Sequence, residues 1–167
     1  LIDDTKNVNT GASMLLGPTM DSLRSASILK NLRTLHIRMK QHSHNAMYLA
    51  ERFERDGLKV SYPGLPSHRD HELMKSMMHE GYGFGGLMTL DVETTERANA
   101  LMELMQSENL GYLAVSLGFY KTLFSCSGSS TSSEIPEQER LKMGISDGLI
   151  RFSIGLDQDI ERTYHKM

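Results

Sequence analysis

The longest periodic pattern of hydrophobic positions lies between Asp21 and Gly57. Apolar residues and one histidine recur there at alternating steps of four and three, at Ile28, Leu32, Leu35, Met39, His42, Ala46, Leu49 and Phe53. This spacing places them all on one face of an α-helix. Asp21 contributes to a helix-start signal, and Gly57 is a stop signal. We therefore predict one long helix, roughly 50 Å in length at about 1.5 Å per residue, that two domains share.

Four shorter runs alternate apolar and polar positions as half-buried strands do. They are residues 58–62, 87–92, 113–118 and 149–156. Ser67, Thr94 and Pro136 are start signals for helices between them. Single helices between strands are typical of an α/β two-layer domain. The segment from Ser125 to Ser133 is almost wholly Ser, Gly, Thr and Cys, so it is either a flexible linker or, given its place between strands, a functional loop.

Two features could be mistaken for ligand sites. Gly81 to Gly86 resembles a phosphate-binding loop, but a strand pattern follows it, whereas such a loop needs a helix directly after the glycines. His68 and His71 could share a metal, but no second group with ligand spacing accompanies them, and we expect exposed histidines at a helix start. His42 lies on the helical stripe and is expected to be a hydrogen-bonded core residue. We therefore predict no metal site.

The last strand run carries a single charge. A turn signal at residues 146–148 precedes it, and the side chains then alternate between two faces. Arg151 shares its face with the small residues Ser153 and Gly155, whereas the apolar residues Ile150, Phe152 and Ile154 share the other. A guanidinium on a strand face needs water or an anion, because an unpaired buried charge is costly. Its planar fork suits a carboxylate, so Arg151 is either a solvated arginine or an anion-binding one.

Composition narrows the class of protein. The 167 residues are 39% hydrophobic and 23% charged, as in soluble globular domains. The net charge of −3 argues against binding to a nucleic-acid backbone. No apolar run is long enough to span a membrane, and the single cysteine, Cys126, points to a reducing, intracellular compartment. Leu1 is not a methionine, so we expect this sequence to be a piece of a longer chain.

Several motifs together resemble one protein family. They are Arg33-Thr34-Leu35 with Arg38-Met39 and His42, Tyr62-Pro63-Gly64-Leu65-Pro66-Ser67-His68 followed by His71-Glu72-Leu73, Gly83-Phe84-Gly85-Gly86, Ala114-Val115-Ser116-Leu117-Gly118, and Gly144-Ile145-Ser146-Asp147-Gly148-Leu149-Ile150-Arg151. In this order and spacing, over nearly the whole chain, they are similar to the Cys/Met-metabolism family of pyridoxal-phosphate (PLP) enzymes. That family includes cystathionine γ-synthase, cystathionine γ-lyase and methionine γ-lyase.

The resemblance implies the C-terminal portion of such an enzyme, with the aspartate-aminotransferase-like fold (PLP fold type I). Residues 1–33 would be the tail of the large PLP-binding domain and the start of a long inter-domain helix. Residues 34–167 would form the C-terminal small domain, an α/β (α+β two-layer) unit with a mainly antiparallel sheet and helices on one side. The Schiff-base lysine of the family lies upstream. We therefore expect no catalytic residue in this piece, which should be inactive alone.

The resemblance also implies substrate-binding roles for three residues. In the family, the arginine that matches Arg151 binds the α-carboxylate of the substrate, and the serine that matches Ser116 assists at the same group. Thr131 matches a threonine of a further loop. The family has a histidine directly after that threonine, and this chain has Ser132 instead.

The expected function is that of a PLP-dependent C–S lyase of sulfur amino-acid metabolism. The region from Ser116 to Ile135 looks more like methionine γ-lyases, which convert methionine to methanethiol, 2-oxobutanoate and ammonia, than like cystathionine synthases. Expected partners are a small sulfur amino acid and further copies of the chain, as a cytoplasmic homotetramer (dimer of dimers), with no nucleic acid and no membrane. The alternatives are cystathionine γ-synthase or γ-lyase activity, a non-catalytic α/β interaction module, and an RNA-binding plait, which the acidic balance disfavours.

Overall fold

The computed structural model describes residues 11–12, 16–17, 19–127 and 135–167, without the side chains of residues 137 and 141. The chain forms two compact units, residues 1–36 and 37–167. In the first unit, helix α3 (Ser22–Leu32) is capped by Asp21, whose carboxylate accepts a hydrogen bond from the backbone N–H of Arg24 at 2.9 Å. Every residue of α3 is exposed, including Leu23 and Leu29.

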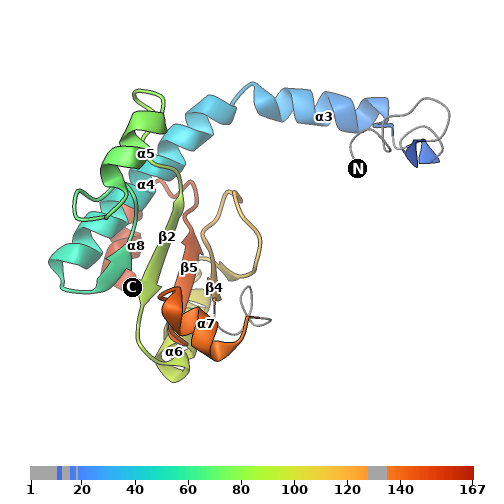
Figure 1. The fold of residues 1–167 in the computed structure, drawn as a ribbon. Coiled ribbons are helices and arrows are strands. Elements are labelled where there is room, and N and C mark those ends of the chain that lie inside the picture. Colours follow the sequence, from blue (N-terminus) through green and yellow to red (C-terminus); the bar gives the residue numbers. More distant parts are fainter. Residues whose placement is uncertain (1–10, 13–15, 18, 128–134) are drawn as a thin grey trace. The chain divides into compact units, whose positions relative to one another are not determined.

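The second unit is built on a sheet of five strands within the described residues. The other helices and strands that the structure describes are α4 (Leu35–Arg55), β1 (Lys59–Ser61), α5 (His71–Met77), β2 (Leu87–Asp91), α6 (Thr95–Ser107), β3 (Tyr112–Leu113), β4 (Leu123–Cys126), α7 (Glu137–Lys142), β5 (Leu149–Ser153) and α8 (Ile160–Lys166). The strand order is β1-β2-β5-β4-β3, and all neighbours are antiparallel except β3 and β4. Although β5 comes last in sequence, it lies between β2 and β4 in the middle of the sheet (Figure 1).

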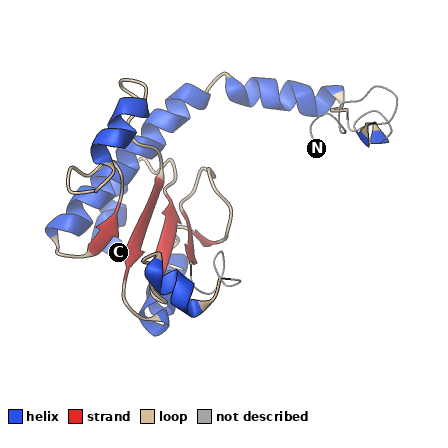
Figure 2. Cartoon of the chain, in the orientation of Figure 1, coloured by secondary structure: helices blue, strands red, loops and turns tan. Residues whose placement is uncertain are grey.

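One face of this sheet carries the hydrophobic core. Ile150 and Phe152 of β5 are fully buried there, in register with apolar residues of β2 and β4. The apolar faces of α4, α6 and α8 complete the core, through Ala46, Leu49, Ala50, Phe53, Ala98, Met102, Met105 and Ile160. Burial of each large apolar side chain contributes about 1.5–3 kcal/mol. A mainly antiparallel sheet with its core helices on one side confirms the predicted fold class (Figure 2).

The prediction of one continuous long helix is wrong. The helical run is interrupted between Leu32 and Leu35, because both the backbone N–H and the hydroxyl of Thr34 donate to the carbonyl of Asn31, at 3.4 Å each. Threonine side chains that bond to nearby carbonyls in this way compete with the regular helical pattern. Burial also differs along the predicted apolar face of this helix. Its residues up to Met39 are exposed, and its residues from His42 onward are buried.

The strand predictions also need correction around residues 113–126. Strand β3 ends at Leu113, and residues 114–118 form a loop rather than a strand. Strand β4 was missed, because its Ser125 and Cys126 were assigned to a linker or loop. All four residues of β4 are buried, so they do not show the alternation on which the prediction relied. Helix α5 begins at His71, because the Ser67 hydroxyl donates to the carboxylate of Glu54 instead of capping a helix.

Candidate anion-binding site

Arg151 lies in the middle of a polar row that crosses three strands. It is half-buried on β5, with Thr89 of β2 directly beside it on one side and Ser125 of β4 on the other. Side chains of directly paired residues lie on the same face of a sheet, about 4.5–5.5 Å apart at Cβ. The row is on the face opposite to that of Phe152, as the alternation of the sequence predicted. Arg151 is therefore presented on a central strand with a hydroxyl side chain on each side.

The turn that leads into β5 is fixed by close packing and by side-chain bonds. At Gly148, a Cβ atom would lie 2.4 Å from the backbone N of Thr94, so only glycine fits there without a shift of the backbone. The Ser146 hydroxyl donates to the Asp91 carboxylate at 2.6 Å. Arg140 of α7 forms an ion pair with Asp147 at 3.1 Å. These contacts set where β5 begins and therefore where Arg151 lies.

The charge of Arg151 is not neutralised within the described part of the chain. No carboxylate of the described residues forms an ion pair with it, and its Nε atom is buried without a hydrogen-bond partner there. Asp91 lies on the same face, but its Oδ1 already accepts hydrogen bonds from Ser146 and from the backbone N–H of Glu93. A half-buried guanidinium in this state is suited to an external anion, above all a planar carboxylate.

Ser116 lies on the loop that follows β3. The loop is attached to β5 and the residues after it, because the Gly118 N–H donates to the Ser153 hydroxyl at 3.0 Å and the Leu156 N–H donates to the carbonyl of Tyr120 at 2.7 Å. Ser153 shares a face with Arg151, two residues along β5. Ser116 therefore lies two residues before Gly118, which contacts Ser153 on the sheet face that carries Arg151. Ser116 is exposed, and among the described residues no hydrogen bond joins it to Arg151. Thr131 lies outside the described residues.

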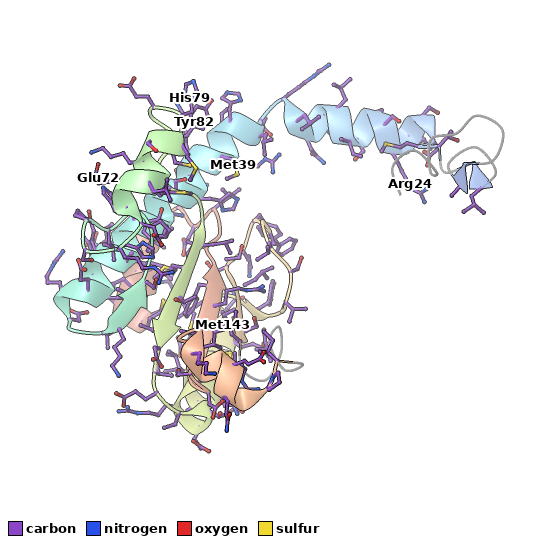
Figure 3. All side chains as sticks on the ribbon, viewed as in Figure 1. Arg24, Met39, Glu72, His79, Tyr82 and Met143 are labelled. Carbon is purple, nitrogen blue, oxygen red and sulfur yellow. The ribbon has the colours of Figure 1, made fainter. Side chains whose placement is uncertain are left out.

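A cavity of about 460 Å³ begins beside Ser153. Its walls are mainly apolar and come from α4, α5, the start of β2 and the residues that follow β1, β3 and β5. The apolar lining residues are Met39, Pro63, Met74, Phe84, Leu87, Leu117 and Ile154. Met39 is on α4, as the side-chain view shows (Figure 3). His42 also lines the cavity, and its Nδ1 lies 2.6 Å from the Ile154 carbonyl oxygen. This buried, bonded position confirms that His42 is a core residue.

The other features that could suggest a ligand site are structural. The glycine-rich residues 81–86 lead into strand β2 and not into a helix, as predicted. The expectation that His71 is exposed is wrong. Its ring stacks on Phe84, with 5.2 Å between the ring centroids, and its Nδ1 lies 2.9 Å from the carbonyl oxygen of Pro63. Within the part of the chain that the structure describes, no group of three metal-ligating side chains comes together. No helix among these residues is long and apolar enough to cross a membrane.

A PLP cofactor needs a lysine for its aldehyde, and the described residues do not offer a suitable one. The lysines that the structure describes are all exposed or only partly buried, and Lys59 and Lys166 form ion pairs with Glu93 and Glu108. The half-buried guanidinium of Arg151, which has no ion pair among the described residues, has the chemistry to bind an acid group instead. The described residues therefore offer an arginine suited to an anion, and none of the described lysines is fully buried.

The fold defines this chain as part of a PLP-dependent enzyme of fold type I. A solved structure of a putative O-acetylhomoserine (thiol)-lyase from Campylobacter jejuni, which carries a pyridoxyl-lysine phosphate group, has a TM-score of 0.77 and 30% identity over 90% of this chain and 37% of its own. The chain belongs to the Cys/Met metabolism PLP-dependent enzyme family, whose family model matches residues 2–162.

Curated relatives carry several names within that family. The chain is 44% identical to methionine gamma-lyase of Arabidopsis thaliana, over 98% of this chain and 37% of the relative. It is 38% identical to cystathionine beta-lyase of Coxiella burnetii, over 80% of this chain and 34% of the relative. It is 34% identical to a chloroplastic cystathionine gamma-synthase of Arabidopsis thaliana, over 94% of this chain and 27% of the relative. The chain thus spans about a third of the length of these relatives.

Sequence reasoning identified Arg151 but not the residues beside it. Thr89 and Ser125 are brought to Arg151 by strand pairing, and they are 62 and 26 residues away in sequence. Their distance from Arg151 in the sequence does not reveal the contact, because the fold determines which strands pair. Ser153 was noted only as a small residue on the face of Arg151, whereas the structure shows that it also holds the loop of Ser116.

Proposed function

We propose that this chain supplies the substrate-carboxylate site of a longer PLP-dependent C–S lyase, with methionine as the substrate. The observation that carries the proposal is the half-buried Arg151 on the central strand, with a buried Nε and no ion pair to any described carboxylate. The 44% identity to a methionine gamma-lyase supports methionine as the substrate. Residues 1–33 belong, in this proposal, to the end of a large cofactor domain, and residues 34–167 form the small domain.

Arg151 acts in this proposal by binding and orienting the amino acid. Its guanidinium donates two parallel hydrogen bonds to the α-carboxylate, a charge-assisted contact worth about 1.5–3 kcal/mol. Holding the carboxylate fixes the direction of the Cα–H bond, and orientation of this kind lowers the barrier in well-positioned systems. PLP, when bound, supplies the electron sink for the reaction. Ser116 assists at the same carboxylate, and Thr131 is a further substrate-binding residue.

The cavity beside Ser153 supports an apolar side chain on the substrate. Ser153 is two residues along β5 from Arg151, roughly 7 Å at about 3.4 Å per residue. That separation suits an amino acid that has its acid group on the guanidinium and its thioether in the cavity. The cavity walls include two flexible, polarisable methionines, Met39 and Met74. Methionine therefore fits better than cystathionine, whose side chain ends in a second charged amino-acid group.

Cystathionine cleavage or synthesis is the second candidate function. Cystathionine lyases at 37–38% identity are close enough in sequence to keep it open. In either case the chain alone is inactive, since a suitable lysine is missing from its described residues, and the complete enzyme is a cytoplasmic homotetramer.

The test replaces Arg151 in the complete protein. We expect Arg151→Lys to lower kcat/KM for methionine about 100-fold, mainly through KM, because an ammonium cannot form the forked pair with a carboxylate. The visible absorbance of bound PLP should stay unchanged. Arg97→Lys is the matched control, because Arg97 is an exposed arginine on α6. Unchanged kcat/KM in Arg151→Lys would remove the assignment. Cleavage of cystathionine but not of methionine by the unaltered protein would establish the second candidate.

A further inference from the structure

Two buried polar atoms without partners lie on directly paired residues. Ser125 of β4 and Arg151 of β5 are paired Cα to Cα in the antiparallel ladder. The Oγ atom of Ser125 and the Nε atom of Arg151 are both buried, and neither has a hydrogen-bond partner within the described residues. Ser125 as a whole is 3% exposed. Such orphaned groups are rare in native structures, so two on one cross-strand pair need an explanation.

The two groups are chemically complementary. The Nε–H of an arginine is a donor only, and a serine hydroxyl has two acceptor lone pairs. Their pairing on adjacent strands puts the side chains within reach of each other, directly or through one water molecule. Because both atoms are inaccessible, a ligand that approaches from the open side meets the terminal Nη groups of Arg151 and not its Nε. Ser125 is therefore suited to hold the arginine from behind.

We propose that Ser125 is a positioning residue, whose hydroxyl accepts a hydrogen bond from Arg151 Nε–H when a carboxylate is bound. This inference rests on the proposed function, since it assigns the residue that orients the carboxylate-binding arginine. The guanidinium is planar, so a bond at Nε fixes its plane and the direction of its two Nη groups. Both Nη groups then face the ligand together, as a bidentate pair requires. Without the bond, the guanidinium rotates and one of the two contacts is lost.

The experiment measures carboxylate recognition in the complete PLP-loaded protein. One readout is the Kd of propionate, a carboxylate that cannot react. The other is the ratio of kcat/KM for methionine to that for methioninamide, which lacks the carboxylate. We expect Ser125→Ala to raise the Kd of propionate and to lower the ratio, each about tenfold. Ser125→Thr keeps the hydroxyl and should retain both values. Ser127→Ala, which removes another buried serine hydroxyl, is the matched control and should change neither.

Several outcomes would overturn the proposal. An unchanged propionate Kd and an unchanged ratio in Ser125→Ala would show that Ser125 does not hold Arg151. An equal loss for methionine and methioninamide would show a structural role alone. Ser125→Gly provides the same comparison if the alanine variant does not fold. Arg151→Lys separates this failure from that of the proposed function, because the ratio in that variant falls only if Arg151 binds the carboxylate.

Discussion

The Nδ1 atom of His42 lies 2.6 Å from the carbonyl oxygen of Ile154, so helix α4 is bonded to the chain directly after β5. Because a carbonyl can only accept, the Nδ1–H group of His42 is the donor in this contact. Asn45, one turn further along α4, donates to the carbonyls of Gly155 and Asp157 at 3.0 and 2.8 Å. Three carbonyls of one segment thus accept from one helix, which fixes the end of the strand that carries Arg151.

Removal of the His42 donor should destabilise the fold. We expect His42→Leu to lower the free energy of unfolding by about 1–3 kcal/mol, because the buried carbonyl of Ile154 loses its partner. Urea denaturation at pH 7 measures the change. His44→Leu is the matched control, since His44 is exposed on the same helix and should be within about 0.5 kcal/mol of the unaltered protein. Equal stability of the two variants would show that the bond to Ile154 contributes nothing.

Because Tyr62 is buried, we expect the free energy of unfolding to fall in alkaline solution. Burial raises the pKa of its phenol, which is fully buried and donates to the carbonyl of Gly85 at 2.8 Å. The unfolded chain ionises tyrosine near pH 10, whereas the buried phenol keeps its proton. Above about pH 10 the native state therefore binds more protons than the unfolded state, and the free energy of unfolding falls as pH rises.

Unfolding measured in urea at several pH values between about 9 and 11 tests this expectation. Tyr62→Phe should make the fall with pH shallower, because the group that loses its proton on unfolding is gone. Tyr120→Phe should leave the slope unchanged, since Tyr120 is 58% exposed. Identical slopes in all three proteins would contradict the role of Tyr62.

Gly155, just after β5, is a position where we expect even an alanine to destabilise the fold strongly. A Cβ atom there would lie 2.5 Å from the backbone of Lys121 and Thr122, atoms that cannot move aside independently. We expect Gly155→Ala to cost more than about 3 kcal/mol. Gly144→Ala has open space around its Cβ and only the strain of a positive φ, and it should cost about 1 kcal/mol. Thermal and urea unfolding compare the two, and a smaller effect at Gly155 would contradict the close approach.

A charge in the cavity wall should reduce the use of methionine. Met74 of α5 lines the cavity, whereas Met77 of the same helix does not and is 66% exposed. If the thioether occupies the cavity, Met74→Glu in the complete protein should lower kcat/KM for methionine about tenfold, because a carboxylate in the cavity wall disfavours an apolar ligand. Met77→Glu should behave like the unaltered protein in the same assay of 2-oxobutanoate release. Equal rates in both variants would place the side chain elsewhere.

Periodicity predicted the parts of this fold in which burial follows a simple repeat. The strand that carries Arg151 was predicted because Ile150 and Phe152 alternate with residues of the other face, and the structure confirms that alternation. The long helix was predicted as continuous because a stripe of apolar residues records one face and not the hydrogen bonds along it. The bonds of Thr34 to Asn31 interrupt the helix without changing the stripe.

The candidate site was predictable only where one residue carried the signal. Arg151 is conspicuous as the one charge in an apolar run, and the family motif supported its role. Ser125 is not conspicuous, since serine, glycine and cysteine around it also describe a linker. Its importance arises from its pairing with Arg151, a contact between strands that no local pattern contains.

The central place of β5 has a consequence for the synthesis of the protein. Strands β1 to β4 emerge from the ribosome first, but β2 and β4 do not pair with each other, and each has one edge that pairs only with β5. A nascent chain that ends before Leu149 therefore exposes two unpaired strand edges, which are sites of association between chains. Closure of the sheet, and with it protection from aggregation, has to wait for residues near the end of this sequence.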